Sequence, residues 1–296
     1  MSAKQPTLYN WLTLVFLSIV WGSSFILMKK GLVSFSPVQV ATLRISIAFL
    51  VFLPYIMKVY KNIPKEKLKT IFFIGLLGSF VPAFLFAKAQ TEIDSAPAGI
   101  LNSLTPLFTY LWGIFLFSQP KSPKRLLGIG IGFLGAIILI IKPEQGFSLN
   151  IFALLILLAT ILYGLSGNLA KYYLQQVDPK QITAISFLYV GIAALTILGF
   201  TDFISVMQTD SQAWLSLLYV AILSLVGTAF ALMLFWKLIQ DTDAIFGSMT
   251  TYFIPVVAIL WGLLDGEQLS WQQYLGFGLI VVSVFLVKSQ PKTSEK

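Results

Sequence analysis

The sequence predicts an all-α integral membrane protein of ten transmembrane helices, built as two five-helix repeats inserted in opposite orientations. Three observations lead to this prediction: a composition too apolar for water, ten apolar stretches of membrane-spanning length, and a residue pattern that occurs twice. Of the 296 residues, 57% are hydrophobic and only 11% are charged, whereas soluble domains average about 45–50% apolar and about 25% charged residues. The lipid bilayer is therefore the expected surroundings of most of the chain.

Composition also excludes several classes of function. The net charge of +8 comes from basic residues in short loops, so we expect a topological origin and no nucleic-acid partner. The chain has no cysteine and no histidine, which excludes disulfides, thiolate chemistry, histidine metal sites and a histidine general base. We therefore expect no cofactor, no metal site and no catalytic residue, and we do not expect an enzyme.

Each predicted span is an apolar stretch near the length that crosses a bilayer, about 20 residues of helix for a hydrocarbon core of about 30 Å. The stretch that begins at Trp11 has no A-x-A-like cleavage site, so we expect a first span and not a signal peptide. Connections are too short to form a soluble domain. The ten expected spans are residues 11–28, 38–57, 71–87, 96–117, 126–141, 149–170, 182–200, 214–236, 244–264 and 271–287.

The distribution of basic residues between alternate loops predicts the orientation of the chain. Fifteen lysines and arginines outside the spans fall on the side of the N-terminus, against four on the other side. Basic residues concentrate in cytoplasmic loops. We therefore expect a multi-pass protein with both termini in the cytoplasm.

Residue matches at two fixed spacings indicate an internal duplication. At a spacing of 149 the matched pairs are Gly78 and Gly227, Phe86 and Phe235, Lys88 and Lys237, Asp94 and Asp243, Pro106 and Pro255, Trp112 and Trp261, and Gly113 and Gly262. At a spacing of 142 they are Gly22 and Gly164, Ser24 and Ser166, Lys29 and Lys171, Pro37 and Pro179, and Gln39 and Gln181. Because five helices is an odd number, the half at 146–296 must enter the membrane opposite to the half at 1–145. Inverted repeats of this kind recur in secondary transporters, where the two halves exchange conformations around a central site.

Several of these residues carry a family resemblance. The segment Trp21-Gly22-Ser23-Ser24-Phe25, Arg44 in the second span, and the helices of Pro106 and Pro255 resemble the drug/metabolite transporter (DMT) superfamily, EamA type. The resemblance covers nearly the whole chain. It implies ten helices, a central cavity, and export or exchange of amino acids or related metabolites across a bacterial inner membrane.

The best site candidate in the sequence lies at the two matched prolines. Pro106 and Pro255 fall near the centres of the fourth and ninth spans, and each removes a hydrogen bond to the carbonyl four residues earlier. These carbonyls belong to Asn102 and Thr251, so each half is expected to place an unpaired carbonyl beside a polar side chain at the midplane. The alternative is a helix kink satisfied by a neighbouring helix, with Asn102 as an interhelical contact.

Aromatic and hydroxyl side chains share a helix face in the first and sixth spans. Trp21, Ser24 and Met28 follow i, i+3, i+7 spacing, and Tyr163, Ser166 and Ala170 repeat the arrangement. Such faces suit a cavity for an amino-acid-like or aromatic solute, or else ordinary aromatic packing. Tyr252 is a further expected lining residue, whereas Asn168 lies off the stripe.

Arg44 is the one charged residue well inside a predicted span, and intramembrane charges are by default functional. It is expected to meet a substrate carboxylate, or instead to extend outward or pair with Glu92 or Asp94. Four matched residues at span ends are candidates for gate or ion-pair partners, or for anchors and helix N-caps. These are Lys88, Asp94, Lys237 and Asp243.

Glycines in the fifth and tenth spans indicate close helix packing, either against a neighbouring helix or against a second protomer in a homodimer. They are Gly128, Gly130, Gly132, Gly135, Gly276 and Gly278. No acidic residue lies deep in a span, so a buried carboxylate relay for protons is not expected, and exchange or facilitated diffusion is at least as well supported.

The sequence therefore predicts a secondary transporter that exports or exchanges a small neutral or zwitterionic metabolite, with a cavity formed by spans one, three, four, six, eight and nine. Two other classes compete with it. A membrane enzyme on lipid or isoprenoid substrates normally carries clustered carboxylates or a histidine, and a scaffold or sensor has no need of matched mid-span prolines.

Overall fold

The computed structural model describes residues 6–142, 148–242, 246 and 250–288. Within these residues the chain is a bundle of apolar helices, with one short antiparallel pairing between β1 (Ile141–Lys142) and β2 (Ser148–Leu149). Eight helical segments have the length and composition of a membrane span, and two shorter apolar helices cover Phe253–Leu264 and Trp271–Leu286. The protein is thus an integral membrane protein by the character of its helices.

The helix bounds lie close to the predicted spans. The elements of the first half are α1 (Leu8–Gly31), α2 (Pro37–Val59), η1 (Tyr60–Asn62), α3 (Lys65–Gly75), η2 (Leu76–Phe80), α4 (Val81–Ala89), α5 (Ser95–Asn102), α6 (Thr105–Phe117) and α7 (Pro123–Ile140). Those of the second half are α8 (Ile151–Tyr173), α9 (Pro179–Gly199), α10 (Phe203–Thr209), α11 (Ala213–Ser224), η4 (Leu225–Phe230), α12 (Ala231–Asp241), α14 (Thr250–Leu264) and α15 (Trp271–Lys288).

Helix starts follow local capping chemistry. The Thr7 Oγ1 accepts a hydrogen bond from the Asn10 backbone N–H, and the Asn10 Oδ1 accepts one from the Thr7 backbone N–H. Ser36 and Gln39 form the same capping box before α2. Pro37 occupies the first turn of α2, where its missing N–H has no intrahelical partner to lose. These caps fix the start of two spans that frame the interior.

Three of the spans are interrupted near their middle. The third span contains the π-helical turn η2 between α3 and α4, and the eighth contains the π-helical turn η4 between α11 and α12. The fourth span stops at Asn102 and restarts at Thr105, so α5 and α6 are separate helices. Interruptions of this kind frequently mark functional positions in helices.

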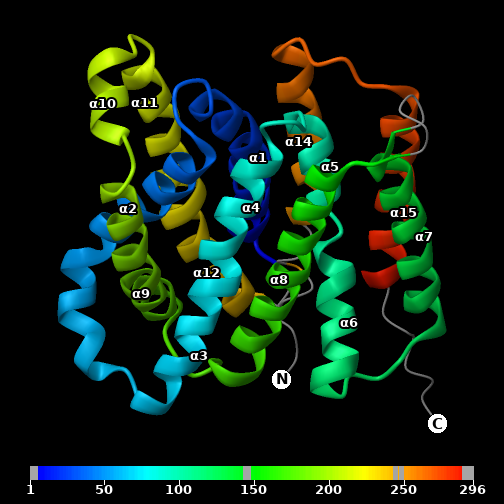
Figure 1. The fold of residues 1–296 in the computed structure, drawn as a ribbon. Coiled ribbons are helices and arrows are strands. Elements are labelled where there is room, and N and C mark those ends of the chain that lie inside the picture. Colours follow the sequence, from blue (N-terminus) through cyan, green and yellow to red (C-terminus); the bar gives the residue numbers. More distant parts are fainter. Residues whose placement is uncertain (1–5, 143–147, 243–245, 247–249, 289–296) are drawn as a thin grey trace.

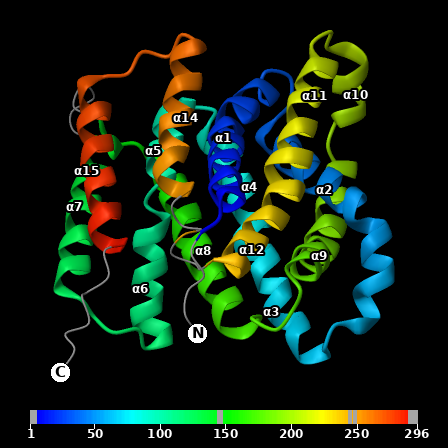
Figure 2. The ribbon, with the colours of Figure 1, turned by 180° about the vertical axis from the view of Figure 1, so that it is seen from behind.

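Each half contributes helices to both sides of the interior (Figures 1 and 2). Helix α1 packs against α14 and α11, α8 against α4 and α6, and α2 against α9. Helices α7 and α15 lie side by side at one edge of the bundle in both views.

The glycines of the fifth and tenth spans serve the packing of α7 on α15. A Cβ at Gly135 would lie 2.9 Å from the Gly276 carbonyl oxygen, and a Cβ at Gly276 would lie 2.8 Å from the Leu139 side chain. A neighbouring helix therefore accounts for these two glycines. Gly130 and Gly278 face open space.

Candidate functional site

The middle of α1 approaches the π-helical turn η4. The Trp21 indole Nε1 donates a hydrogen bond to the Gly227 carbonyl at 3.0 Å, and its ring stands edge-on to Phe235 at 5.0 Å between centroids. Ser24 is buried and donates to the Val20 carbonyl of its own helix. A Cβ at Gly227 would lie 3.0 Å from the Ser24 Oγ, so glycine permits this approach.

Arg44 reaches the same turn from α2. Its Nε donates to the Thr228 Oγ1 at 2.8 Å, and its backbone carbonyl accepts a hydrogen bond from Ser224 at 2.5 Å. The Thr228 hydroxyl donates in turn to the Leu223 carbonyl at 3.3 Å, as expected for a hydroxyl at a π-helical turn. The Arg44 guanidinium lies close enough to the Tyr163 phenol of α8 for the two groups to interact electrostatically.

The terminal nitrogens of Arg44 have no partner within the chain as far as the structure describes it. No carboxylate forms an ion pair with Arg44 among the described residues, and its one side-chain hydrogen bond is the one from Nε to Thr228. Asp94 pairs with Lys29 instead, and Glu92 is exposed at the helix end. The pairing of Arg44 with Glu92 or Asp94 that the sequence left open is therefore absent from this conformation.

Contacts between the two halves occur in matched pairs. A Cβ at Gly78 in η2 would lie 2.5 Å from the Ser166 Oγ, which corresponds to Gly227 and Ser24. Tyr163 stacks on Phe86 at 6.1 Å, as Trp21 contacts Phe235.

The match extends to two further glycines. A Cβ at Gly22 would lie 2.5 Å from the Val257 Cβ, and one at Gly164 would lie 3.1 Å from the Phe108 Cβ. Each pair lies at the repeat spacing. Arg44 has no such match, because the residue at the repeat spacing is Ser186, which donates a hydrogen bond within its own helix. The interior guanidinium is therefore a feature of the first half alone.

The two candidates beside the prolines, Asn102 in α5 and Thr251 in α14, lie on helices that pack together. Helix α5 packs on α14, and a Cβ at Gly99 would lie 2.4 Å from the Ala258 Cβ. The expectation of an unpaired carbonyl at Asn102 is wrong, because the Thr105 hydroxyl donates to that carbonyl at 2.8 Å. The Asn102 side-chain Oδ1 is buried and has no hydrogen-bond partner in the described structure.

Pro106 and Pro255 have different surroundings despite their match. Pro106 stands in the first turn of α6, after the break in the fourth span, whereas Pro255 lies inside α14. Thr251 lies in the first turn of α14 and is half-buried. The side chain of Tyr252 and the whole of Asp243 lie outside the described residues.

Ion pairs gather at the end of the bundle opposite the start of α1. Lys29 lies 3.1 Å from Asp94, 3.1 Å from Asp265 and 2.8 Å from Glu267, and Lys30 also pairs with Asp265. This set of five residues is called the Lys29 cluster below. Its lysines hold the pKa of the Asp265 carboxyl below its usual range, Lys30 most strongly.

The other span-end candidates take different roles. Lys88 stands over the Phe152 ring at 5.7 Å, and Lys237 pairs with Asp241 on its own helix at 3.3 Å. Asp94 occupies the N-cap position of α5, but the prediction that its side chain caps the helix is wrong. The Glu267 carboxylate caps α5 instead, accepting from the backbone N–H groups of Ser95 and Ala96 at 2.9 and 3.0 Å.

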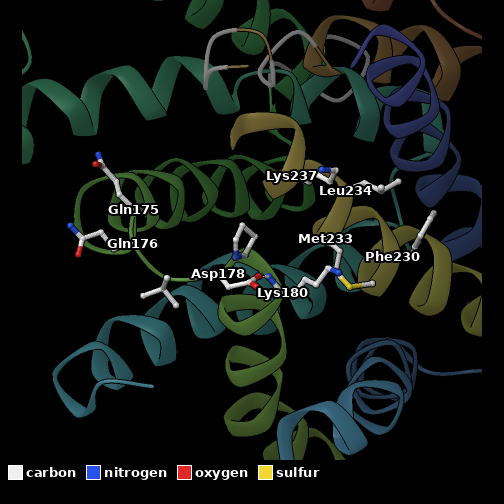
Figure 3. Close-up of a pocket in the computed structure, with 10 residues that line it drawn as sticks. Gln175, Gln176, Asp178, Lys180, Phe230, Met233, Leu234 and Lys237 are labelled. Carbon is white, nitrogen blue, oxygen red and sulfur yellow. Dashed lines mark hydrogen bonds between the residues drawn. The ribbon is translucent and has the colours of Figure 1, made fainter. Parts of the chain in front are cut away.

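An open pocket of about 740 Å³ lies at the other end of the bundle (Figure 3). The connection between α8 and α9 forms one wall, and η4 and α12 form the other. Phe230, in this second wall, is two residues from Thr228. The lining residues are Gln175, Gln176, Val177, Asp178, Pro179, Lys180, Phe230, Met233, Leu234 and Lys237.

Both halves of the chain match the model of a known protein family. The model of the EamA-like transporter family matches residues 9–141 and again residues 150–289. The chain belongs to the EamA-like transporter family. The sequence resemblance to EamA-type transporters is thereby confirmed.

Relatives of this EamA-like chain are named as transporters. It is 28% identical to a probable amino-acid metabolite efflux pump of Salmonella typhimurium over 90% of this chain and 91% of that protein. It is 25% identical to an uncharacterized transporter of Archaeoglobus fulgidus over 94% and 98% of the two chains. It is 29% identical to an uncharacterized inner membrane transporter of Escherichia coli over 92% and 88%.

A solved structure supports the fold of this EamA-like chain. A crystal structure, described only as that of a protein, superimposes with a TM-score of 0.63 and covers 94% of this chain and 96% of its own. Its sequence identity is 17%, so the likeness concerns the fold alone.

The sequence places Arg44 and Trp21 inside predicted spans, but it does not show that they contact Thr228 and Gly227. The repeat match of Gly227 is the one sequence signal at these two positions. Glu267 was missed because nothing in a loop sequence shows that its carboxylate reaches a helix of the other half. The available signal was position, since Lys29 and the connection after span nine fall on the same side in the predicted topology.

Proposed function

We propose that this EamA-like protein is a secondary transporter that moves a small zwitterionic metabolite, such as an amino acid, out of the cell by alternating access. Membership of a transporter family and the names of the relatives support the class. The observation that carries the solute class is the free guanidinium end of Arg44 in the interior. A half-buried guanidinium that has no carboxylate partner among the described residues is suited to bind a carboxylate bidentately on a solute.

The residues around Arg44 fit a solute of modest size with an apolar or aromatic side chain. Trp21 and Tyr163 present one aromatic ring from each half, and rings with a polar tip suit stacking combined with one hydrogen bond. Thr228 fixes the Arg44 fork by binding its Nε. In this proposal the ammonium group of the solute binds the Asn102 Oδ1 of α5, a buried acceptor that has no hydrogen-bond partner in the described structure.

The architecture in this proposal is ten spans in two inverted halves. The matched glycine and aromatic contacts, the separate family match to each half, and the two additional apolar helices support it. Both termini are cytoplasmic in this arrangement, as the distribution of basic residues predicts. The pocket that ends at Phe230 then opens to the cytoplasm, as an exporter loading its solute requires.

Counterflow in proteoliposomes tests the function. Vesicles loaded with one unlabelled solute at a time are assayed for uptake of the same labelled solute, across amino acids and the amines that their decarboxylation gives. We expect exchange of one or more amino acids and at least tenfold less of the matching amine, because only the acid offers Arg44 a carboxylate. Folded protein that exchanges no solute contradicts the proposal, and equal exchange of acid and amine contradicts the role of Arg44.

A further inference from the structure

The Lys29 cluster joins the two halves of the chain at one end of the bundle. Lys29 and Lys30 end α1, and Asp94 precedes α5, so these three residues belong to the first half. Asp265 and Glu267 lie in the connection from α14 to α15, in the second half. The ion pairs of Lys29 with Asp265 and Glu267, and of Lys30 with Asp265, therefore join the first half to the second.

The backbone of the connection holds Glu267 in place. Gly266 has a φ of 83°, and the Glu267 N–H donates to the Gly262 carbonyl at 2.9 Å. This is the hydrogen-bond pattern of a glycine-terminated helix end. A Cβ at Gly262 would lie 2.4 Å from the Glu267 Oε2, so both glycines make room for the turn and its carboxylate.

Glu267 is the central residue of the cluster. Its side chain is only 3% exposed. It accepts from Lys29 at 2.8 Å and from the first two N–H groups of α5 at 2.9 and 3.0 Å. A buried carboxylate with a cationic partner and two helix N–H donors is strongly held in this conformation.

The interior beneath the cluster is closed. Ser95 is fully buried, and Met28 and Phe25 are 3% and 6% exposed. Helix α14 is joined to α1 near this end by a hydrogen bond on the outer surface, from the Trp261 Nε1 to the Ser23 Oγ at 2.7 Å. Close packing of these side chains is what the closed end of a transport pathway requires.

The opposite end of the bundle has a different character. It holds the pocket of about 740 Å³. The ion pair described there, Lys237 with Asp241, lies within one helix and ties no two elements together. Among the described residues, the ion pairs between separate elements all belong to the closed end.

We infer that the Lys29 cluster is the gate at this end of the pathway: it is intact while the pocket end is open, and it must separate for the solute to leave. This inference rests on the proposed alternating access. Separation releases the first turn of α5, and α5 is a helix of eight residues that ends at Asn102. Opening of the gate is thereby connected mechanically to the break in the fourth span.

The absence of native cysteines allows a direct test by thiol labelling in lipid nanodiscs, where a hydrophilic maleimide reaches both faces. The Ser95 Oγ is buried and has no partner in the described structure, so Ser95→Cys loses no hydrogen bond and reports on the gate. Met233→Cys reports on the pocket. Each reporter is combined with Lys29→Gln, which retains the Glu267 cap of α5 and leaves three carboxylates without their shared cation.

With the gate intact, we expect slow labelling of Ser95→Cys and fast labelling of Met233→Cys. Lys29→Gln should accelerate the first at least tenfold and slow the second severalfold, because the conformer with the cluster end open gains population. Glu267→Gln, checked for a monodisperse fold, should act in the same direction. Glu92→Gln is the matched control, and it should change neither rate. Glu92 is an exposed acid in the connection from α4 to α5, which also holds Asp94, and it forms no ion pair among the described residues.

Two outcomes overturn the gate. The first is a labelling rate of Ser95→Cys that Lys29→Gln leaves unchanged. The second is faster labelling of Ser95→Cys with no slowing at Met233→Cys, which indicates only local fraying at the cluster. Counterflow by the same proteins separates this inference from the proposed function. Reciprocal labelling without exchange of any solute leaves the gate standing and removes the function, whereas exchange without reciprocal labelling removes the gate alone.

Discussion

Substitution of Gly164 by alanine tests the matched helix contacts on which the two-half architecture depends. A Cβ at Gly164 would lie 2.7 Å from the Thr109 backbone nitrogen and 2.8 Å from the Phe108 carbonyl carbon. Optimal contacts between carbon atoms are about 3.5–4.0 Å, so α8 and α6 must separate by roughly 0.8 Å. Backbone atoms cannot rotate out of the way, and overpacking of this kind costs about 1–3 kcal/mol.

The same helix supplies the control. Gly167 also lies in α8, and a Cβ there meets nothing within 4 Å. Gly167→Ala should therefore be neutral or stabilise by up to about 1 kcal/mol, because alanine has the higher helix propensity.

Thermal unfolding of the purified variants measures the difference. At about 2–4 °C per kcal/mol, we expect Gly164→Ala to melt several degrees below Gly167→Ala. The separation also strains the hydrogen bonds of the Asn168 amide, which donates to the Thr109 and Gly164 carbonyls at 2.8 Å. Equal melting temperatures for the two variants contradict the close approach of α8 and α6.

Two further predictions concern stability. Thr105→Val should cost about 0.5–1.5 kcal/mol, because it removes the part-buried hydrogen bond from the Thr105 hydroxyl to the Asn102 carbonyl. Thr196 is the control, because its exposed hydroxyl is hydrogen-bonded within its own helix, and Thr196→Val should change the free energy of unfolding by no more than about 0.5 kcal/mol. Equal melting temperatures for the two variants would show that the Asn102 carbonyl does not depend on the Thr105 hydroxyl. Because Lys30 lowers the pKa of Asp265, ionised Asp265 stabilises the fold above its unfolded pKa of about 3.9, and this contribution is lost as the pH falls through the lower folded value. Wild type should melt above Asp265→Asn at pH 7, and the gap should narrow below about pH 4; a gap that narrows between pH 7 and 5 contradicts the assignment.

The spans could be predicted from the sequence because hydropathy over about 20 residues is a local property. The predicted first span, 11–28, becomes α1 at Leu8–Gly31, and the fourth, 96–117, becomes Ser95–Phe117 in two helices. The extra residues belong to caps and to lysines at the helix ends. The number of spans remains a prediction, since the structure supplies eight long apolar helices and two shorter ones.

The interruptions of the helices could not be predicted in the same way. The turns η2 and η4 contain the matched glycines Gly78 and Gly227, but glycine alone does not distinguish a π-helical turn from ordinary close packing. Pro106 predicted a kink, and the structure has a two-residue interruption between α5 and α6, where the Thr105 hydroxyl donates to the Asn102 carbonyl. Short α10 was not predicted either, because seven residues between two spans leave no periodic signal.

Contacts between the halves were the least predictable part of the candidate site. A repeat spacing identifies equivalent residues such as Trp21 and Tyr163, but it does not say which residue of the other half each one meets. The approach of Trp21 to Gly227 and of Glu267 to α5 depends on tertiary packing across more than 150 residues of sequence. Charge pairing at helix ends is similarly underdetermined, as the different partners of Lys29 and Lys88 show.

Counterflow by Arg44→Gln tests the central claim most directly. Arg125, the other arginine of the sequence, stacks on Tyr110 at 5.0 Å near the start of α7 and is the matched control. With a solute that the wild type exchanges, we expect Arg44→Gln to lose at least tenfold in rate and Arg125→Gln to retain most of it, with both proteins folded and reconstituted equally. Exchange by Arg44→Gln at the rate of Arg125→Gln contradicts the assignment of Arg44 as the residue that binds the carboxylate of the solute.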